Sequence, residues 1–298
     1  MAQAPLCQAP DPVLKKPDFV LPPLSCDCHA HICGPESRYP YSPNRIYTPP
    51  DALLPQYEVL LATLGVERAV LVQPSIYGSD NRALLAVLKN NPERYRGVAV
   101  VEENISDSEL ETLHQIGIRG LRCNIVDLAK DKGILPIQML KKLALRIAPL
   151  GWHLEFLMHV NEFPDLNKTF ENFPVEIVTS HLGYAKGALE VSNRGFQNWL
   201  SLMREGRAWT KLSGPYRTSQ ALKPPYQDTQ VFAEALIKAN PERVIWGTDW
   251  PHVMVNGFMP NDADLCNLLL QWAPDQSIRK KILVDNPQVL YQFRAHHN

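Results

Sequence analysis

Two histidines separated by one residue are the strongest chemical signal in this chain. His29 and His31 end a short apolar run, Leu24–Ile32, whose composition predicts a β-strand. Side chains at positions i and i+2 project from the same face of a strand, so both imidazoles should point into one space. Paired imidazoles at a strand end can hold a metal ion or polarise a carbonyl group. An isolated pair is more often two unrelated histidines, so its meaning depends on the other residues nearby.

A reactive side chain also ends or follows three other strand-like runs. These side chains are Arg122, His181 and Asp249. Each has a structural alternative: Arg122 could pair with a surface carboxylate, His181 could be a hydrogen-bonded core histidine, and Asp249 could cap a turn. A random scatter of such residues would not repeat the same position, so the pattern favours one shared site.

Three further residues are weaker candidates for holding a substrate. They are Arg217, Tyr47 and Ser75. Arg217 and Tyr47 belong to two long connections, 214–226 and 33–50, and long loops on a compact scaffold are usually lids or substrate walls. Arg122 and Arg217 could bind an acid group of a substrate through charge-assisted hydrogen bonds. Each of the three could instead be an ordinary loop residue.

Short β-branched runs alternate with amphipathic segments along the chain. Strands are expected at Leu24–Ile32, Arg68–Ser75, Tyr95–Val101, Ile118–Asn124, Trp152–Met158, Val175–Ser180, Ala208–Ser213 and Arg243–Thr248. Helical segments include Asp51–Leu64, Asn81–Asn91, Ser106–Ile116, Pro136–Pro149 and Gln230–Ala239. Eight such units predict an α/β protein, a closed (β/α)₈ or TIM barrel, with its chemistry at the C-terminal ends of the strands. An open doubly wound sheet is the alternative, but no Gly-rich dinucleotide fingerprint opens the first helix.

The composition is typical of a soluble globular protein. The chain has 298 residues, of which 45% are hydrophobic and 20% charged, and its formal net charge is −1. Without a basic stripe, nucleic acid is not an expected partner, and no apolar run is long enough to cross a bilayer. The first twenty residues lack the apolar core of a secretory signal, and the six cysteines are expected to be reduced thiols. These features predict a cytoplasmic protein.

The chain is expected to form one barrel, residues 24–298, preceded by a Pro-rich arm. Residues 1–23 contain six prolines and no periodic pattern. Such an arm would lie on the surface of the barrel or on a neighbouring subunit. The expected state is therefore a monomer or a homodimer.

Several motifs, in this order and spacing, resemble the amidohydrolase-related barrels, and within them the 2-pyrone-4,6-dicarboxylate lactonase-like group. The motifs are Asp27-Cys-His-Ala-His31, Gly34-Pro35, Tyr41-Ser-Pro43, Ile46-Tyr-Thr-Pro49, Gln73-Pro-Ser75, Gly117-Ile-Arg-Gly-Leu-Arg122-Cys-Asn124, Gly151-Trp-His153, Ser180-His-Leu-Gly183 and Gly247-Thr-Asp-Trp-Pro251. The resemblance covers most of residues 24–293. It implies an amidohydrolase-like fold, a lactone substrate of the kind met in aromatic degradation, and a reactive centre made of His29, His31, His181 and Asp249. It also implies that no bound metal is needed.

The chain departs from the pattern of the dicarboxylate enzymes at two positions. A second arginine expected just beyond Arg122 is replaced by Leu128, and a tyrosine expected near Leu157 is missing, with His159 close by as a substitute polar contact. With one cationic group fewer, a muconolactone-like, sulfonated or sugar-acid lactone is at least as good a candidate as the pyrone dicarboxylate. The expected partner is a small anionic lactone.

The mechanism that these residues suggest is hydrolytic ring opening. Asp249 would act as general base on a water molecule, while His29, His31 and His181 would stabilise the oxyanion. The acid groups of the substrate would be held by Arg122, Arg217, Tyr47, Ser75 and His159.

Two alternatives stay open at this point. One is a mononuclear metal-dependent amidohydrolase or decarboxylase on the same barrel, with one zinc or manganese ion on His29, His31 and Asp249. A lysine that could bridge two metals is absent at the end of the fourth strand, where Arg122 stands. The other alternative is a barrel that binds a small acid without turning it over.

Overall fold

The computed structural model describes residues 4–124, 135–185 and 191–294, and it contains a parallel eight-stranded barrel. The strands are β1 (Cys26–Ala30), β2 (Arg68–Val72), β3 (Tyr95–Ala99), β4 (Ile118–Asn124), β5 (His153–Leu157), β6 (Ile177–Thr179), β7 (Ala208–Leu212) and β8 (Val244–Trp246). They pair in chain order, and each lies inside the range expected from the sequence. The predicted TIM barrel is therefore confirmed.

The barrel closes where the segment after β8 meets β1. The His31 amide donates to the Trp250 carbonyl at 2.8 Å, and the Asp249 amide donates to the His29 carbonyl at 2.7 Å. Asp27 adds a side-chain tie, because its carboxylate accepts hydrogen bonds from the backbone amide and hydroxyl of Thr248 at 2.9 and 2.6 Å. The closure thus brings two segments that lie far apart in the sequence against each other.

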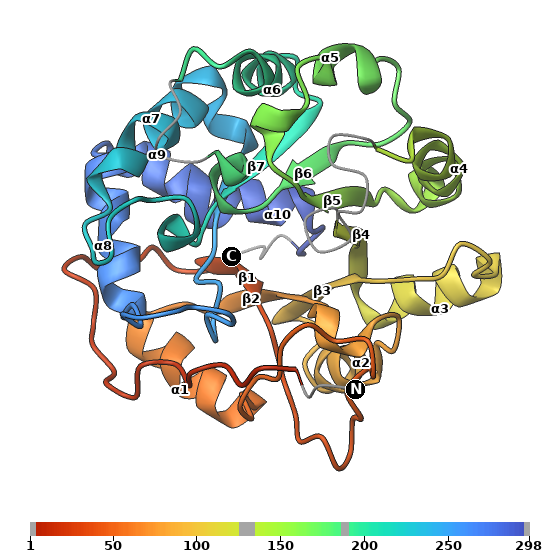
Figure 1. Cartoon of the computed structure of the whole chain (residues 1–298), viewed down its shortest axis with the longest axis horizontal. Coiled ribbons are helices and arrows are strands. Elements are labelled where there is room, and N and C mark those ends of the chain that lie inside the picture. The colour runs from red at the N-terminus through yellow and green to blue at the C-terminus, as the bar shows by residue number, and fades with distance from the viewer. Residues whose placement is uncertain (1–3, 125–134, 186–190, 295–298) are drawn as a thin grey trace.

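Helices surround the strands, as Figure 1 shows. The longer ones are α1 (Leu54–Leu64), α2 (Arg82–Asn90), α3 (Asp107–Ile116), α4 (Ile137–Ile147), α6 (Arg194–Arg204), α7 (Gln230–Ala239) and α8 (Asp262–Trp272), and the shorter ones are α5 (Leu166–Thr169), α9 (Gln276–Lys280) and α10 (Asn286–Leu290). Local signals set some of their ends: Ser106 and Glu109 form a capping box that begins α3, and Gly117 ends it in the left-handed conformation. Among the described residues, no helix has the length and apolar character that a membrane span requires.

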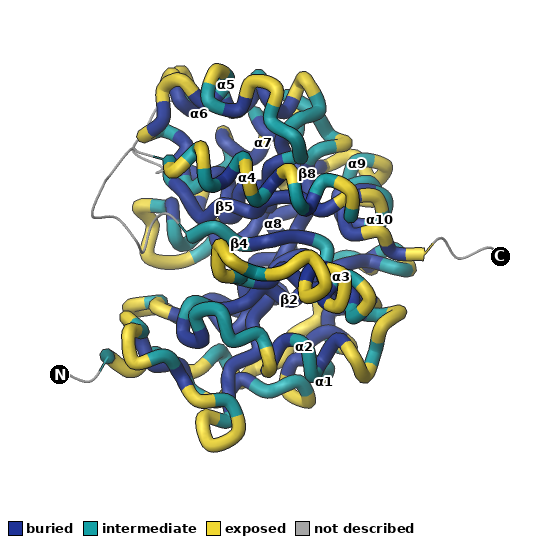
Figure 2. Tube along the Cα trace, turned by 90° about the vertical axis from the view of Figure 1, so that its right-hand side faces the viewer, coloured by how far each residue is buried: buried dark blue, intermediate teal, exposed yellow. Residues whose placement is uncertain are grey.

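Two apolar clusters hold the barrel together. One lies inside the barrel and includes Cys26, Cys28 and Trp209. Tyr291 and Phe293 of the C-terminal segment belong to the same cluster, and Arg96 near the start of β3 donates to the Tyr291 carbonyl. The other, much larger, packs the outer face of the strands against the helices. The buried segments run through the centre of the molecule in Figure 2, with exposed loops and helix faces around them. Because the C-terminal segment covers the N-terminal ends of the strands, a site can form at their C-terminal ends.

Strand β1 is irregular at Cys28 and His29, between Asp27 and Ala30. Its register against β2 runs Asp27 to Ala69 and then Ala30 to Leu71, so β1 has one residue more than its partner. An extra residue of this kind bends a strand and re-aims its side chains. Cys28 lies in the interior cluster, yet the following residue, His29, also reaches interior partners. Simple alternation would have placed the two on opposite faces.

The Pro-rich arm lies against its own barrel in the part that the structure describes. The Cys7 amide donates to the Thr48 carbonyl at 2.8 Å, and Asn261 at the start of α8 donates to the Val13 carbonyl at 2.6 Å. Asn267 on the same helix bonds Asp18. The arm therefore packs on the loop after β1 and on α8.

Candidate active site

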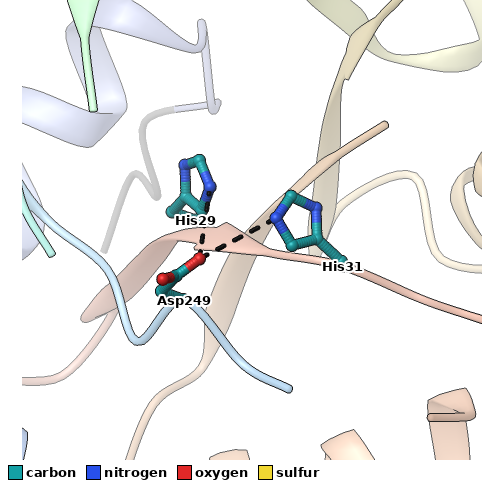
Figure 3. A group of neighbouring side chains, drawn as sticks. All are labelled: His29, His31 and Asp249. Carbon is teal, nitrogen blue, oxygen red and sulfur yellow. Dashed lines mark ion pairs between the residues drawn. The ribbon is translucent and has the colours of Figure 1, made fainter. Parts of the chain in front are cut away.

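The four side chains expected to react come together at the C-terminal end of the barrel. One carboxylate oxygen of Asp249, Oδ1, lies 3.6 Å from His29 Nε2 and 3.8 Å from His31 Nε2 (Figure 3). The other oxygen, Oδ2, lies 3.9 Å from His181 Nδ1. All four side chains are almost fully buried. The structure therefore brings together the four residues that the sequence selected.

The two oxygens of Asp249 have different surroundings. Oδ2 accepts a hydrogen bond from Arg217 Nε at 2.6 Å and another from the Tyr216 hydroxyl at 2.6 Å. Oδ1 is buried and has no hydrogen-bond partner among the residues in the described ranges, and the same holds for His29 Nε2. The carboxylate is thus anchored through one oxygen and presents the other to the histidines.

The environment of Asp249 keeps it ionised. Burial by itself would raise the pKa of this carboxyl, but the Arg217 guanidinium outweighs burial and holds the pKa well below its usual value. Its backbone has a φ of +67°, in the left-handed region, which is costly for a residue with a side chain. A charged carboxylate in a strained turn next to unpaired polar atoms is characteristic of a functional position.

A buried lysine and glutamate, which the sequence reasoning missed, lie beneath His29. Lys211 Nζ on β7 is 2.6 Å from Glu155 Oε2 on β5 and 3.2 Å from His29 Nδ1. Glu155 Oε1 accepts from the Ser180 hydroxyl at 3.1 Å and lies 3.4 Å from His29 Nδ1. A signal was present, since a charged residue in the middle of a strand that is otherwise apolar is rarely buried without a partner.

The three imidazoles are held in a neutral state by burial. Burial and the neighbouring Lys211 lower the pKa of His29, and burial with His29 and Arg122 lowers the pKa of His31 well below its usual value. Burial also lowers the pKa of His181 well below that value, against the opposing effect of Asp249. At neutral pH each ring therefore carries one proton.

The hydrogen bond made by His31 differs from the role expected for it. Its Nδ1 lies 2.7 Å from the Val72 carbonyl oxygen, which can only accept, so the proton of a neutral His31 stands on Nδ1. Its Nε2 then carries a lone pair and cannot donate to an oxyanion. His181 Nδ1 lies 3.0 Å from the Ser213 hydroxyl, a group that can donate or accept. The expectation that all three histidines donate to the substrate therefore needs revision for His31.

Two of the expected substrate-binding residues line a cavity whose walls do not include the four central side chains. A cavity of roughly 370 Å³ is bordered by Ser75 and Arg122, with Arg45 from the loop after β1. Arg122 Nη1 donates to the Gln73 carbonyl at 2.6 Å, which fixes the guanidinium at the cavity wall. Much of the remaining lining is apolar, including Met139 of α4. The cavity thus offers one or two cations within a largely apolar wall.

The other expected contacts lie near this centre in different ways. Arg217 is bound to Asp249, Tyr47 is buried in the loop after β1, and His159 Nδ1 lies 3.1 Å from the Tyr184 carbonyl. The ring of Tyr184 packs on both His159 and His181 and so lies between them. Leu128, the position of the missing second arginine, lies outside the described residues.

One ligand atom from each of His29, His31 and Asp249 could face a single metal ion on distance alone. The three atoms lie within 4.8 Å of one another, and all three residues are buried. Distance is only one requirement, because a histidine ligand must present a lone pair.

Comparisons with known proteins agree with the fold and show the family of this chain. A family model described as Amidohydrolase matches residues 26–293. The chain is 39% identical to a 2-pyrone-4,6-dicarboxylate hydrolase of Comamonas testosteroni over 93% of this chain and 92% of that protein. It is 34% identical to a 4-sulfomuconolactone hydrolase of Hydrogenophaga intermedia over 97% and 95%. A crystal structure from Agrobacterium tumefaciens superposes with a TM-score of 0.84 at 26% identity, covering 93% of this chain and 99% of that one.

Proposed function

Because the chain belongs to the amidohydrolase family, and its relatives above are lactone hydrolases, we propose that it hydrolyses a lactone carrying an anionic group. The observation that supports this most strongly is the free Oδ1 of Asp249. That oxygen is ionised, buried and unpartnered among the described residues, and it faces His29 Nε2 and His31 Nε2. A water molecule placed there could donate one hydrogen bond to Asp249 Oδ1, the base, and another to the Nε2 lone pair of His31.

The proposed reaction adds water across the ester bond of the ring. The water donates one hydrogen bond to Asp249 Oδ1 and the other to the Nε2 lone pair of His31, so its oxygen faces the ester carbon. As the carbon–oxygen bond forms, Asp249 takes a proton and the carbonyl oxygen becomes an oxyanion, which His29 Nε2–H stabilises. The ring carbon–oxygen bond then breaks, and Asp249 returns the proton to the leaving oxygen. The products are a carboxylic acid and a hydroxyl or enol.

The substrate is proposed to carry its acid group at Arg122. The two named relatives act on lactones with carboxylate or sulfonate groups, and the cavity beside Arg122 could accept such a group. A planar guanidinium fixed by the Gln73 carbonyl would orient the anion rather than merely attract it. The pyrone dicarboxylate, a sulfonated muconolactone and a sugar-acid lactone remain the candidates.

A metal-dependent amidohydrolase or decarboxylase is the second candidate, favoured by the spacing of His29, His31 and Asp249. The chemistry of this donor set does not fit a metal ion. Nδ1 of His29 faces the Lys211 ammonium, which can only donate, so the lone pair of His29 points away from the other two residues. The proposed mechanism therefore uses side chains alone.

The test is proton release measured across a panel of carboxylated, sulfonated and uncharged lactones, with and without a chelator. We expect at least one anionic lactone to be opened at the same rate with chelator present, and uncharged lactones of the same ring size to react poorly. Replacing Arg122 by methionine should raise KM about 10- to 100-fold with little change in kcat, since the side chain orients the anion and takes no part in bond making. The proposal is refuted if no lactone is opened, or if the chelator abolishes turnover and zinc or manganese restores it.

A further inference from the structure

Lys211 is an unusual residue for the inside of a barrel. Its side chain is fully buried, and its ammonium has three neighbours within hydrogen-bond distance. They are Glu155 Oε2 at 2.6 Å, the Cys28 carbonyl at 2.8 Å and His29 Nδ1 at 3.2 Å. An ammonium has three N–H groups and no lone pair, so toward each of these neighbours it can only donate. Burying a charge costs free energy unless the charge is paired and hydrogen-bonded, as that of Lys211 is.

The contact with His29 decides where that imidazole carries its proton. Because Lys211 can only donate, Nδ1 of His29 must accept, and a neutral ring then carries its hydrogen on Nε2. Glu155 Oε1 at 3.4 Å and the Ser180 hydroxyl at 3.5 Å are the other neighbours of the same nitrogen, and both are farther away than the ammonium. The nearer group therefore sets the tautomer.

His31 provides a contrast within the same pair. Its Nδ1 faces the Val72 carbonyl at 2.7 Å, so its proton lies on Nδ1 and its Nε2 is a bare acceptor. Imidazoles that bind metals usually make this kind of contact, with the second ring nitrogen donating to a carbonyl or carboxylate. The two rings lie with centroids 5.0 Å apart and nearly perpendicular, yet one presents a donor and the other an acceptor to the same space.

We propose that Lys211 is a positioning residue that fixes the proton of His29 on Nε2, which makes His29 an oxyanion donor and prevents it from ligating a metal ion. This inference rests on the proposed lactone hydrolysis for its catalytic part, while the placement of the proton stands without it. The Lys211 ammonium, in contact with His29 Nδ1, supplies the positive charge that a metal ion would otherwise bring to the site.

The first test is the tautomer of His29 in the intact protein. With ¹⁵N-labelled histidine, NMR distinguishes a protonated ring nitrogen from a bare one, and His29→Gln identifies the resonances of His29 by their loss. We expect Nε2 protonated and Nδ1 bare at neutral pH. Protonated Nδ1 with bare Nε2 would overturn the proposal whatever the lactone panel shows.

The second test removes the ammonium. In Lys211→Met, Glu155 would be left to accept from Nδ1–H of His29, so the proton should move to Nδ1 and free the Nε2 lone pair. We expect this variant to bind zinc at least tenfold more tightly than the wild type, with a shift of the His29 resonances on titration. Turnover of the metal-free variant should fall about 100-fold, as expected for the loss of an oxyanion donor. Equal zinc affinity in the two proteins, with an unchanged tautomer, would refute the proposal.

Two further variants keep the result interpretable. Lys211→Met/Glu155→Gln leaves no unpaired charge in the core, so it serves if the single variant does not fold, and its Gln carbonyl can still accept from Nδ1–H. Lys281→Met removes an exposed lysine that pairs with Glu242 at 2.9 Å, and it should match the wild type in every measurement. A panel without any hydrolysis, combined with the expected tautomer, would refute the lactonase proposal and leave the role of Lys211 in place.

Discussion

Two buried carboxylates flank His29, and they are held in different ways. Glu155 is in contact with Lys211 at 2.6 Å through one oxygen and with the Ser180 hydroxyl at 3.1 Å through the other. Asp249 receives both its short hydrogen bonds, from Tyr216 and Arg217, on a single oxygen. In the described part of the chain its second oxygen has no hydrogen-bond partner.

In the proposed mechanism, one environment thus contains a structural acid, Glu155, and a reactive one, Asp249. Both carboxyls have their pKa held well below the usual value, in each case because charged neighbours outweigh burial, so ionisation alone does not separate them. The separation comes from the cation at the second oxygen: Glu155 Oε2 lies 2.6 Å from Lys211 Nζ, whereas the ion-pair contacts of Asp249 Oδ1 are imidazole nitrogens at 3.6 and 3.8 Å. A buried acceptor without a partner costs free energy, and a bound substrate or water can recover that cost. Each prediction below perturbs one side of this comparison.

The largest effect is expected from Asp249→Asn, which keeps the size of the side chain and removes the base. Turnover should fall about 10³-fold or more, because general base catalysis typically contributes roughly 10²–10⁴. Proton release on the best lactone measures this. Asp165→Asn, which changes an exposed carboxylate paired with Arg194, should keep wild-type turnover. Near-normal turnover of Asp249→Asn would rule out the proposed base.

Glu155→Gln perturbs the structural side, because it leaves the Lys211 ammonium buried without its carboxylate. The free energy of unfolding should fall by about 3–5 kcal/mol, the usual result of removing one partner of a buried ion pair. Urea unfolding gives the value. Glu242→Gln breaks a surface pair with Lys281 and should leave the free energy of unfolding nearly unchanged. Equal losses in the two variants would mean that the Lys211–Glu155 pair contributes no more than a surface contact.

His153 extends the comparison one layer deeper into the barrel, two residues before Glu155 on β5. Burial lowers its pKa to about 4, so below the ordinary histidine value of about 6.5 the unfolded state binds a proton that the folded state does not. Stability should therefore fall as pH falls from about 6.5. The contribution of His153 at pH 5 is about 2 kcal/mol. Urea unfolding of His153→Leu between pH 5 and 7 should show a smaller loss than the wild type, and parallel losses would contradict this interpretation.

Tyr216→Phe should have the smallest effect, because Arg217 still anchors Asp249 Oδ2 when the tyrosine hydroxyl and its 2.9 Å contact with His252 Nδ1 are lost. Turnover is expected to fall about tenfold with KM nearly unchanged, in line with roughly 1.5 kcal/mol for a hydrogen bond to a charged group. Tyr226→Phe is a matched control, since the Tyr226 hydroxyl is buried and has no hydrogen-bond partner within the described ranges. If Tyr216→Phe instead raises KM and leaves kcat unchanged, the tyrosine hydroxyl contacts the substrate and does not act through Asp249.

The fold was predictable from the sequence because each strand is a short apolar run with clear limits. All eight strands fall inside the expected ranges, and β4 matches at both ends. Positions of His29, His31, His181 and Asp249 at strand ends were sufficient to group them, since parallel strands of a barrel share one catalytic end. Lys211 and Glu155 escaped notice because each lies inside a strand, where the sequence does not say what faces it.

The amino-acid sequence alone thus determined the barrel and the set of residues at its mouth, because period and spacing fix which segments are strands and where they end. The tertiary structure decided the chemical state of each group. A lysine on β7 faces one ring nitrogen of His29, and a carbonyl on β2 faces the corresponding nitrogen of His31. Arg217 and Tyr216 occupy one oxygen of Asp249. Proton positions depend on contacts between strands distant in sequence, which no local pattern encodes.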